Sequence, residues 1–187
     1  YSLISTYYLL IIRIISRYLR YTMRILMKRK IEDITYLKSH ELLNRIVMPP
    51  MERARAFKNG DTPVAIMDTY YRQRAKTGLM ISEPIYVSEN SRINAHTSYI
   101  NKKAQINAWK KINQNIEEEL GVIFACLAHG GSYARPEFNK DKKPSSPSGL
   151  CVDASKANSA LSLHEIEAII EDYEKAAQNA FDAMFHG

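Results

Sequence analysis

The segment that most constrains the fold is residues 61–83, in which a helix-like run leads through Gly78 into a short apolar strand. Asp61 or Thr62 can cap a helix over residues 62–77, and Gly78 can end it. The Leu-Met-Ile-Ser-Glu run that follows is typical of a strand buried in a parallel sheet. A capped helix that leads directly into such a strand is one step of an alternating α/β architecture.

The same alternation recurs along the chain. Strands are expected at residues 44–51, 79–83, 122–127 and 181–185, and helices at residues 62–77, 102–120 and 162–180. Ser162 and Glu165 have capping-box spacing at the start of the last helix. This order predicts parallel strands with right-handed crossovers, which fits a doubly wound sheet or a (β/α)8 barrel. No Gly-x-Gly-x-x-Gly follows a strand, which counts against a dinucleotide-binding sheet.

The positive net charge of +6 comes from the amino-terminal region. Seven of the 26 Lys and Arg residues precede Glu32, the first acidic residue, which leaves 19 against 20 Asp and Glu in the rest of the chain. The body therefore gives no electrostatic reason to bind nucleic acid. The chain has two cysteines, too few for a disulfide framework and without metal-site spacing. A reducing, cytoplasmic compartment is the default.

Residues 7–30 combine Leu, Ile and Tyr with arginines at 13, 17, 20 and 24, which share one helical face. Three interpretations stay open: an upstream or misassigned extension that is not part of the native protein, a presequence or membrane-surface helix, and a helix docked on the body. The arginines interrupt any apolar run long enough to span a bilayer. The predicted division is thus a basic extension, 1–30, and a catalytic-type domain, 31–187.

Several segments resemble, in the same order, the amino-terminal half of the old yellow enzyme family, the FMN-dependent NADH:flavin oxidoreductases and ene-reductases. They are Asn-Arg-Ile-Val-Met-Pro-Pro-Met at 44–51, Tyr-Tyr-Arg-Gln-Arg-Ala-Lys-Thr-Gly-Leu-Met-Ile-Ser-Glu at 70–83, Leu-Ala-His-Gly-Gly at 127–131 and Glu-Ile-Glu-Ala-Ile-Ile-Glu-Asp-Tyr at 165–173. The resemblance implies a (β/α)8 barrel of the TIM type, of which this chain would be roughly the first four β/α units. It also implies hydride transfer from NAD(P)H through FMN to an activated alkene or quinone-like small molecule.

The resemblance also implies site residues. Pro50, Met51 and Glu52 would lie beside the flavin, as would Pro84 and Cys126, and His186 would bind substrate; no metal is expected. Three of these depart from the family pattern: Glu52 stands for Thr or Cys, Pro84 for Ala or Gly, and Cys126 for Gln. A carboxylate at Glu52 would lower the reduction potential of a flavin that gains negative charge.

Two alternatives to an active reductase follow from the same sequence. A half-barrel would have open strand edges, so the chain could be a non-catalytic remnant that acts at most as an interaction module or associates with itself. The basic stripe could instead make it a peripheral membrane protein through residues 7–30.

Overall fold

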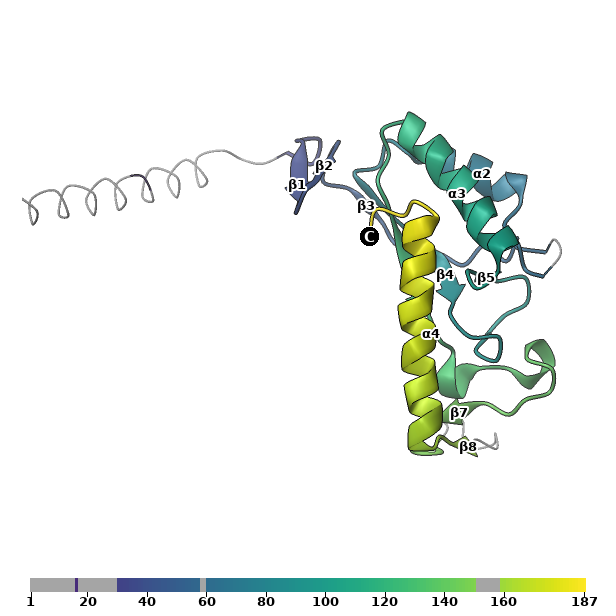
Figure 1. Ribbon diagram of the computed structural model, residues 1–187. Coiled ribbons are helices and arrows are strands. Elements are labelled where there is room, and N and C mark those ends of the chain that lie inside the picture. The colour runs from purple at the N-terminus through teal and green to yellow at the C-terminus, as the bar shows by residue number, and fades with distance from the viewer. Residues whose placement is uncertain (1–15, 17–29, 58–59, 151–158) are drawn as a thin grey trace, which may run out of the picture. The chain divides into compact units, whose positions relative to one another are not determined.

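A computed structural model of the protein describes residues 16, 30–57, 60–150 and 159–187 (Figure 1). The chain divides into two compact units, Tyr1–Asp33 and Ile34–Gly187. The basic helix predicted over residues 7–30 lies outside the described residues, apart from Ser16 and Lys30, and so does Cys151. The three interpretations of the extension therefore stay predictions.

The centre of the second unit is a parallel sheet built around one strand. That strand, β4 (Leu79–Tyr86), pairs with β3 (Val47–Met48), β5 (Ser98–Tyr99) and β6 (Ile123–Ala128), in each case in parallel. Parallel pairing around a buried central strand is the arrangement that the alternation of helices and strands predicted.

Three helices accompany the sheet: α2 (Ala65–Arg72), α3 (Lys103–Glu118) and α4 (Leu163–Asp182). Figure 1 shows α2 and α3 side by side, with α4 as a separate long helix. The core is centred on α3, where Trp109 and Ile116 are fully buried. The Trp109 ring contacts Tyr71 of α2 and Phe185, with ring centroids 5.8 and 5.2 Å apart. The sequence located α3 and α4 to within about two residues at their starts, and the Ser162–Glu165 capping box is present.

Short elements that the sequence did not predict complete the unit. An antiparallel hairpin joins β1 (Thr35–Leu37) to β2 (His40–Leu42), and Lys38 in its turn has φ 52°. Two single turns of 3-10 helix, η1 (Gly131–Tyr133) and η2 (Pro136–Phe138), follow β6. The parallel pair β7 (Ser145–Ser146) and β8 (Ser159–Ala160) comes next.

The helix predicted over residues 62–77 is shorter than expected, and its ends are formed differently. Its N-cap is Val64, whose side chain has no hydrogen-bonding atom, and the Asp61 carboxylate pairs with Arg92 at 2.8 Å instead of capping a helix. Its last residue is Arg72, so Gly78 does not end it. Gly78 is instead a close-approach residue, since a Cβ there would lie 2.1 Å from the Asn44 carbonyl oxygen.

The strand predicted at residues 181–185 is wrong, because α4 continues to Asp182. Backbone pairing with β6 begins later: the His186 N–H donates to the Ile123 carbonyl at 2.9 Å, and the Ala125 N–H donates to the Gly187 carbonyl at 2.7 Å. The apolar residues before His186 therefore belong to the helix end and the core, not to a strand.

Proline 84 lies inside β4, which is longer than the predicted 79–83. The pairing of β4 with β6 shifts register between Ile81 and Pro84, as expected where a proline enters an interior strand. At the shift the Cys126 N–H donates to the Ser82 hydroxyl oxygen at 2.9 Å, and that hydroxyl donates to the Glu83 carbonyl at 2.8 Å. The Ser82 hydroxyl thus takes the place of a backbone carbonyl as the acceptor for the Cys126 N–H.

No helix within the described ranges has an apolar stretch long enough to cross a membrane.

Candidate functional site

The carboxyl ends of β3, β4 and β6 carry the residues that the sequence singled out. Pro50, Met51 and Glu52 follow β3, while Pro84 of β4 lies directly opposite Cys126 of β6. Pro50 and Met51 are exposed, whereas the other three side chains are partly buried. In a parallel α/β barrel this end of the strands is where ligands bind. Five of the six predicted positions therefore lie at one end of the sheet.

Glu52 is held at this end by one of its two carboxylate oxygens. The Asn94 side-chain amide donates to Glu52 Oε2 at 2.6 Å. The other oxygen, Oε1, is buried and has no hydrogen-bond partner. A buried carboxylate oxygen without a donor costs free energy.

A second acidic side chain, Glu83 of β4, lies close enough to Glu52 for the two charges to interact. It is only 1 % exposed and accepts hydrogen bonds from the Arg53 N–H at 3.1 Å and from the Ser98 hydroxyl. The pKa of Glu83 is raised to about 7, mainly by burial and to a smaller extent by the Glu52 carboxylate, against the lowering effect of the hydrogen bonds from Ser98 and Arg53. Two carboxyl groups therefore interact at the carboxyl end of β3 and β4.

Burial also raises the pKa of the neighbouring Tyr86 and Cys126. The Tyr86 pKa rises to about 12, first through burial and then through the Glu52 charge, with a smaller effect from Cys126. The Cys126 thiol has a raised pKa from burial alone. A thiol with a raised pKa is a weak nucleophile, so Cys126 acts as a small apolar residue of the strand.

The residues at this end offer acceptors more than donors. Pro84 has no N–H, and the Cys126 N–H is already bonded to Ser82. The ring of FMN presents one N–H and two carbonyl oxygens along its pyrimidine edge. Neither Pro84 nor Cys126 offers a free backbone donor to a ring carbonyl. Within the described part of the chain, no group of three or more His, Cys, Asp or Glu side chains could hold a metal.

His186, the predicted substrate ligand, lies elsewhere. Its backbone pairs with the start of β6, and its Nδ1 accepts from the Ile123 N–H at 3.3 Å. Its ring contacts His40 of β2, with centroids 5.7 Å apart, and burial lowers its pKa. It lies opposite the start of β6. Cys126 is about two residues further along that strand, which is roughly 7 Å. The structure does not bring His186 together with the other predicted residues, because the strand starts later than the sequence suggested.

His129, at the end of β6, has a structural environment. Its Nδ1 accepts from the Gly131 N–H at 3.0 Å, which fixes the turn, and burial lowers its pKa. It lines an apolar groove of about 440 Å³ together with Ile166, Ile169 and Tyr173 of α4. This groove is separate from the residues predicted to lie beside the flavin.

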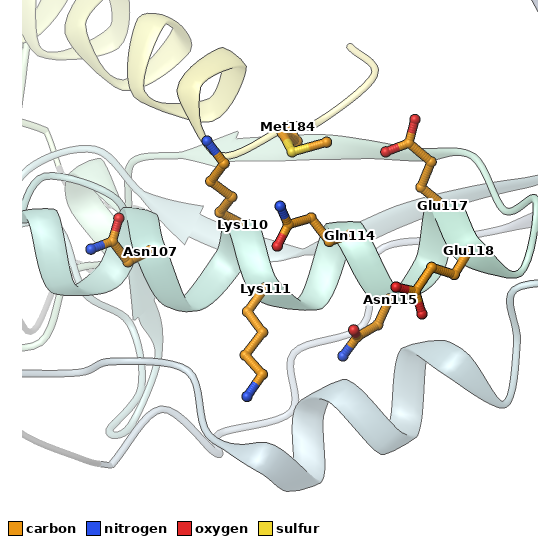
Figure 2. Close-up of a pocket in the computed structure, with 8 residues that line it drawn as sticks. All are labelled: Asn107, Lys110, Lys111, Gln114, Asn115, Glu117, Glu118 and Met184. Carbon is orange, nitrogen blue, oxygen red and sulfur yellow. The ribbon is translucent and has the colours of Figure 1, made fainter.

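A polar hollow on the outer surface of α3 is a poor candidate for a site. It is lined by Asn107, Lys110, Lys111, Gln114, Asn115, Glu117, Glu118 and Met184. Figure 2 shows that Lys110 and Lys111 extend in different directions, so the two cations do not converge on one point. Mixed charges on an exposed helix face are typical of a solvated surface.

Sequence reasoning missed four residues of the site: Ser82, Glu83, Tyr86 and Asn94. Glu83 carried a usable signal, since a carboxyl group inside an apolar strand must find donors or become protonated. Asn94 carried none, because its amide reaches Glu52 from a loop 42 residues further along the chain.

Three comparisons identify similar proteins. The sequence profile described as "NADH:flavin oxidoreductase / NADH oxidase family" matches residues 34–187. Chanoclavine-I aldehyde reductase of Penicillium roqueforti is 38% identical to this chain, and the match covers 79% of this chain and 41% of that protein. 12-oxophytodienoate reductase 1 of Oryza sativa is 31% identical, and the match covers 79% of this chain and 40% of that protein.

Solved structures agree with the sequence matches. The old yellow enzyme homologue of Zymomonas mobilis has 34% identity and a TM-score of 0.77, and the match covers 85% of this chain and 47% of that one. Morphinone reductase in complex with tetrahydroNAD has 29% identity and a TM-score of 0.79, covering 84% and 48%. The chain thus spans less than half the length of each of these four proteins.

Proposed function

The chain belongs to the NADH:flavin oxidoreductase / NADH oxidase family, the old yellow enzymes, and from this we propose that it forms the flavin-facing part of an FMN-dependent reductase of activated alkenes. The observation that carries the proposal is the gathering of Met51, Glu52, Pro84 and Cys126 at the carboxyl ends of three parallel strands. The fold confirms the predicted α/β class, since the solved relatives are TIM barrels and match this chain over about half their length.

In this proposal the chain's residues orient the ring and the substrate. Met51 and Pro84 would supply apolar contacts to a flat ring, and Glu52 would place a carboxylate beside it. Bound there, FMN would supply hydride transfer between NAD(P)H and a small-molecule acceptor such as an activated alkene. Tyr86 stays protonated at neutral pH because its pKa is raised to about 12. It therefore adds no second negative charge beside Glu52.

Other residues would bind the phosphate of FMN. In TIM barrels the phosphate site is commonly formed by the loops after the seventh and eighth strands. This chain aligns with less than half of its solved relatives, so we assign it contacts to the ring rather than to the phosphate.

The test is flavin binding by the full chain. We expect purified protein to retain FMN on gel filtration and to quench its fluorescence. The dissociation constant should be about 1 μM or higher, which corresponds to a binding free energy of about −8 kcal/mol or weaker. The variant Pro84→Ala together with Cys126→Gln adds an N–H and a side-chain amide at this end, and we expect it to bind FMN more tightly. Protein that fails to bind FMN in both forms would overturn the proposal.

An interaction module is the second candidate, and the outer face of α4 favours it. Leu163, Ile170 and Phe181 lie along one side of this helix and are 80%, 61% and 74% exposed. Large apolar side chains aligned in this way are typical of a surface that another element covers.

Association of the chain with itself would separate the two candidates. We expect sedimentation to show concentration-dependent association of the wild type, and Ile170→Lys with Phe181→Lys to reduce it. A monodisperse monomer over the same concentrations would rule out self-association through α4, without bearing on FMN binding.

A further inference from the structure

Three loops leave the carboxyl ends of the parallel strands, and the middle one is bonded to both of the others. The first loop, after β3, is residues 49–57 and 60–64; the middle loop, after β4, is residues 87–97; the third loop, after β6, is residues 129–144. In a parallel α/β barrel the loops at this end carry the binding residues. The bonds that hold the loops to one another therefore decide where those residues lie.

Three contacts join the middle loop to the first. They are the ion pair of Arg92 Nη1 with Asp61 Oδ2 at 2.8 Å, the bond from the Asn94 amide to Glu52 Oε2 at 2.6 Å, and the bond from the Ala56 N–H to the His96 carbonyl at 3.0 Å. The side chains of Arg92 and Asp61 are only 20% and 21% exposed, so solvent screens their attraction less than that of a surface pair. The first loop is thus held on both sides of its described part.

The middle loop is joined to the third by a side-chain amide that bonds in both directions. Asn139 Oδ1 accepts from the Arg92 N–H at 3.0 Å, and its Nδ2 donates to the Arg92 carbonyl at 2.8 Å and to the Arg135 carbonyl at 2.7 Å. The Arg135 N–H donates to the same Arg92 carbonyl at 2.9 Å, and the Gly130 N–H donates to the Ser91 carbonyl at 2.8 Å. Asn139 is 1% exposed. Arg92 is therefore the residue at which the bonds to both neighbouring loops meet.

The charge of Arg92 depends on Asp61. Arg92 Nε is buried and has no hydrogen-bond partner, and Asp61 is the only carboxylate that pairs with this guanidinium within the described residues. Asp61 has φ 60°, a left-handed conformation that is unfavourable for a residue with a side chain. Without the guanidinium, a largely buried carboxylate would stay unpaired on an unfavourable backbone, so the first loop would move to relieve both.

We propose that Arg92 is a positioning residue of the flavin site, which holds the first loop through its ion pair with Asp61 and thereby keeps Met51 and Glu52 where the ring binds. The inference rests on the proposed function and assigns Arg92 no contact with the ring. Asn139 fixes the Arg92 backbone from the third loop. The three loops therefore act as one support for the flavin-facing side chains.

The test measures FMN affinity by fluorescence quenching for the full chain and for a double-mutant cycle. We expect Arg92→Met to bind FMN about tenfold more weakly, as for the loss of one hydrogen bond between charged groups. Asp61→Asn removes the charge but suits the same backbone conformation, and it should also weaken binding. The double variant should bind no more weakly than Arg92→Met, because both changes remove the same ion pair. Arg92→Lys keeps the charge and should recover most of the affinity.

The matched control is Lys140→Met. Lys140 also joins the third loop to the middle one, through an ion pair with Glu89, but its side chain is 80% exposed. We expect this variant to bind FMN like the wild type. Hydrogen exchange gives a readout without flavin: in Arg92→Met the Ala56 N–H should exchange faster, whereas the amides of α3 should keep their wild-type rates.

The possible results separate the inference from the function on which it rests. Wild-type FMN affinity in Arg92→Met, or losses that add up in the double variant, overturns the inference and leaves FMN binding in place. An equal loss in Lys140→Met does the same. Exchange that quickens in α3 as much as at Ala56 would show that Arg92 only stabilises the fold, which also overturns it. Absence of FMN binding in every protein, the wild type included, overturns the proposed function and with it the role of Arg92 at the flavin site.

Discussion

Helices α3 and α4 are both amphipathic, but they bury very different side chains. α3 buries Gln105, Trp109, Ile112, Asn113 and Ile116, whereas α4, although longer, fully buries only Ala176 and Ala180. α3 contacts α2 and α4, and α4 contacts α3 and β6, but the face of α4 that carries Leu163, Ile170 and Phe181 stays exposed. An amphipathic pattern thus reports which residues could be buried, and the neighbouring elements that cover each face decide which are.

The strongest test of this contrast is Trp109→Ala in α3. We expect the free energy of unfolding to fall by about 3–5 kcal/mol, because a fully buried ring between Tyr71 and Phe185 is lost and a cavity remains. Denaturant unfolding followed by circular dichroism measures it. Trp109→Phe should cost less, since it also removes the unpartnered Nε1. A loss below about 1 kcal/mol for the alanine variant would show that α3 is not the core.

Glu83 of β4, whose N–H donates to the Tyr71 hydroxyl of α2 at 2.8 Å, gives the next largest effect. Its pKa in the folded protein is about 7, against 4.5 for an ordinary glutamate side chain in water, so the folded state binds the proton more tightly. The unfolding free energy should therefore fall as pH rises from about 5 to 7, by roughly 3 kcal/mol from this group. Glu83→Gln removes that slope.

The comparison of wild type with Glu83→Gln isolates this group from the histidines. Burial lowers the pKa of His129 and of His186, so these residues destabilise the folded state as pH falls below about 6.5. Their effect has the opposite sign and cancels in the difference between the two proteins. Parallel pH profiles of stability would contradict the assignment of a raised pKa to Glu83.

Loss of the amino-terminal cap of α4 should lower the free energy of unfolding by about 1 kcal/mol. The Ser162 hydroxyl accepts from the Glu165 N–H at 3.3 Å, and Glu165 Oε2 accepts from the Ser162 N–H at 2.8 Å. Ser162→Ala loses this cap, and hydrogen exchange should quicken in the first turn of α4. Ser162→Asp retains an acceptor and should exchange like the wild type. Faster exchange throughout the unit would mean that α4 unfolds together with the core.

Phe181→Ser should have the smallest effect on the isolated monomer, within about 0.5 kcal/mol, because the ring is 74% exposed. Denaturant unfolding at low protein concentration measures it. A loss similar to that of Trp109→Ala would show that α4 has a covering partner on this face.

Local sequence signals correctly predicted the elements that are defined by contacts between residues close together in the sequence. The Ser162–Glu165 box joins residues three apart, and the apolar spacing in α3 repeats along one helix, so both were read correctly. The start of α2 could not be predicted in this way, because the Asp61 carboxylate accepts a hydrogen bond from Arg92, which is 31 residues away. The fourth strand was misplaced because Phe181 fits a strand or a helix equally well, and only its neighbours decide.

The residues of the candidate site also fall into those that the sequence predicted and those that it could not predict. The sequence placed Glu52, Pro84 and Cys126 near one another through a family resemblance, and the sheet register brings Pro84 opposite Cys126. The resemblance could not place His186, because its position depends on where α4 ends. Asn94 and Ser82 act on residues 42 and 44 positions away, which no local pattern reveals.

The hydroxyl of Ser82 makes a proline at position 84 tolerable inside the sheet. A Ser82→Ala variant would leave the Cys126 N–H without its acceptor, whereas the same change made together with Pro84→Ala could let the strand regain an ordinary ladder. The two positions should then be epistatic, with the double variant more stable than the sum of the single changes predicts. In an evolving lineage, the order of events would matter: the serine has to be present before the proline is accepted.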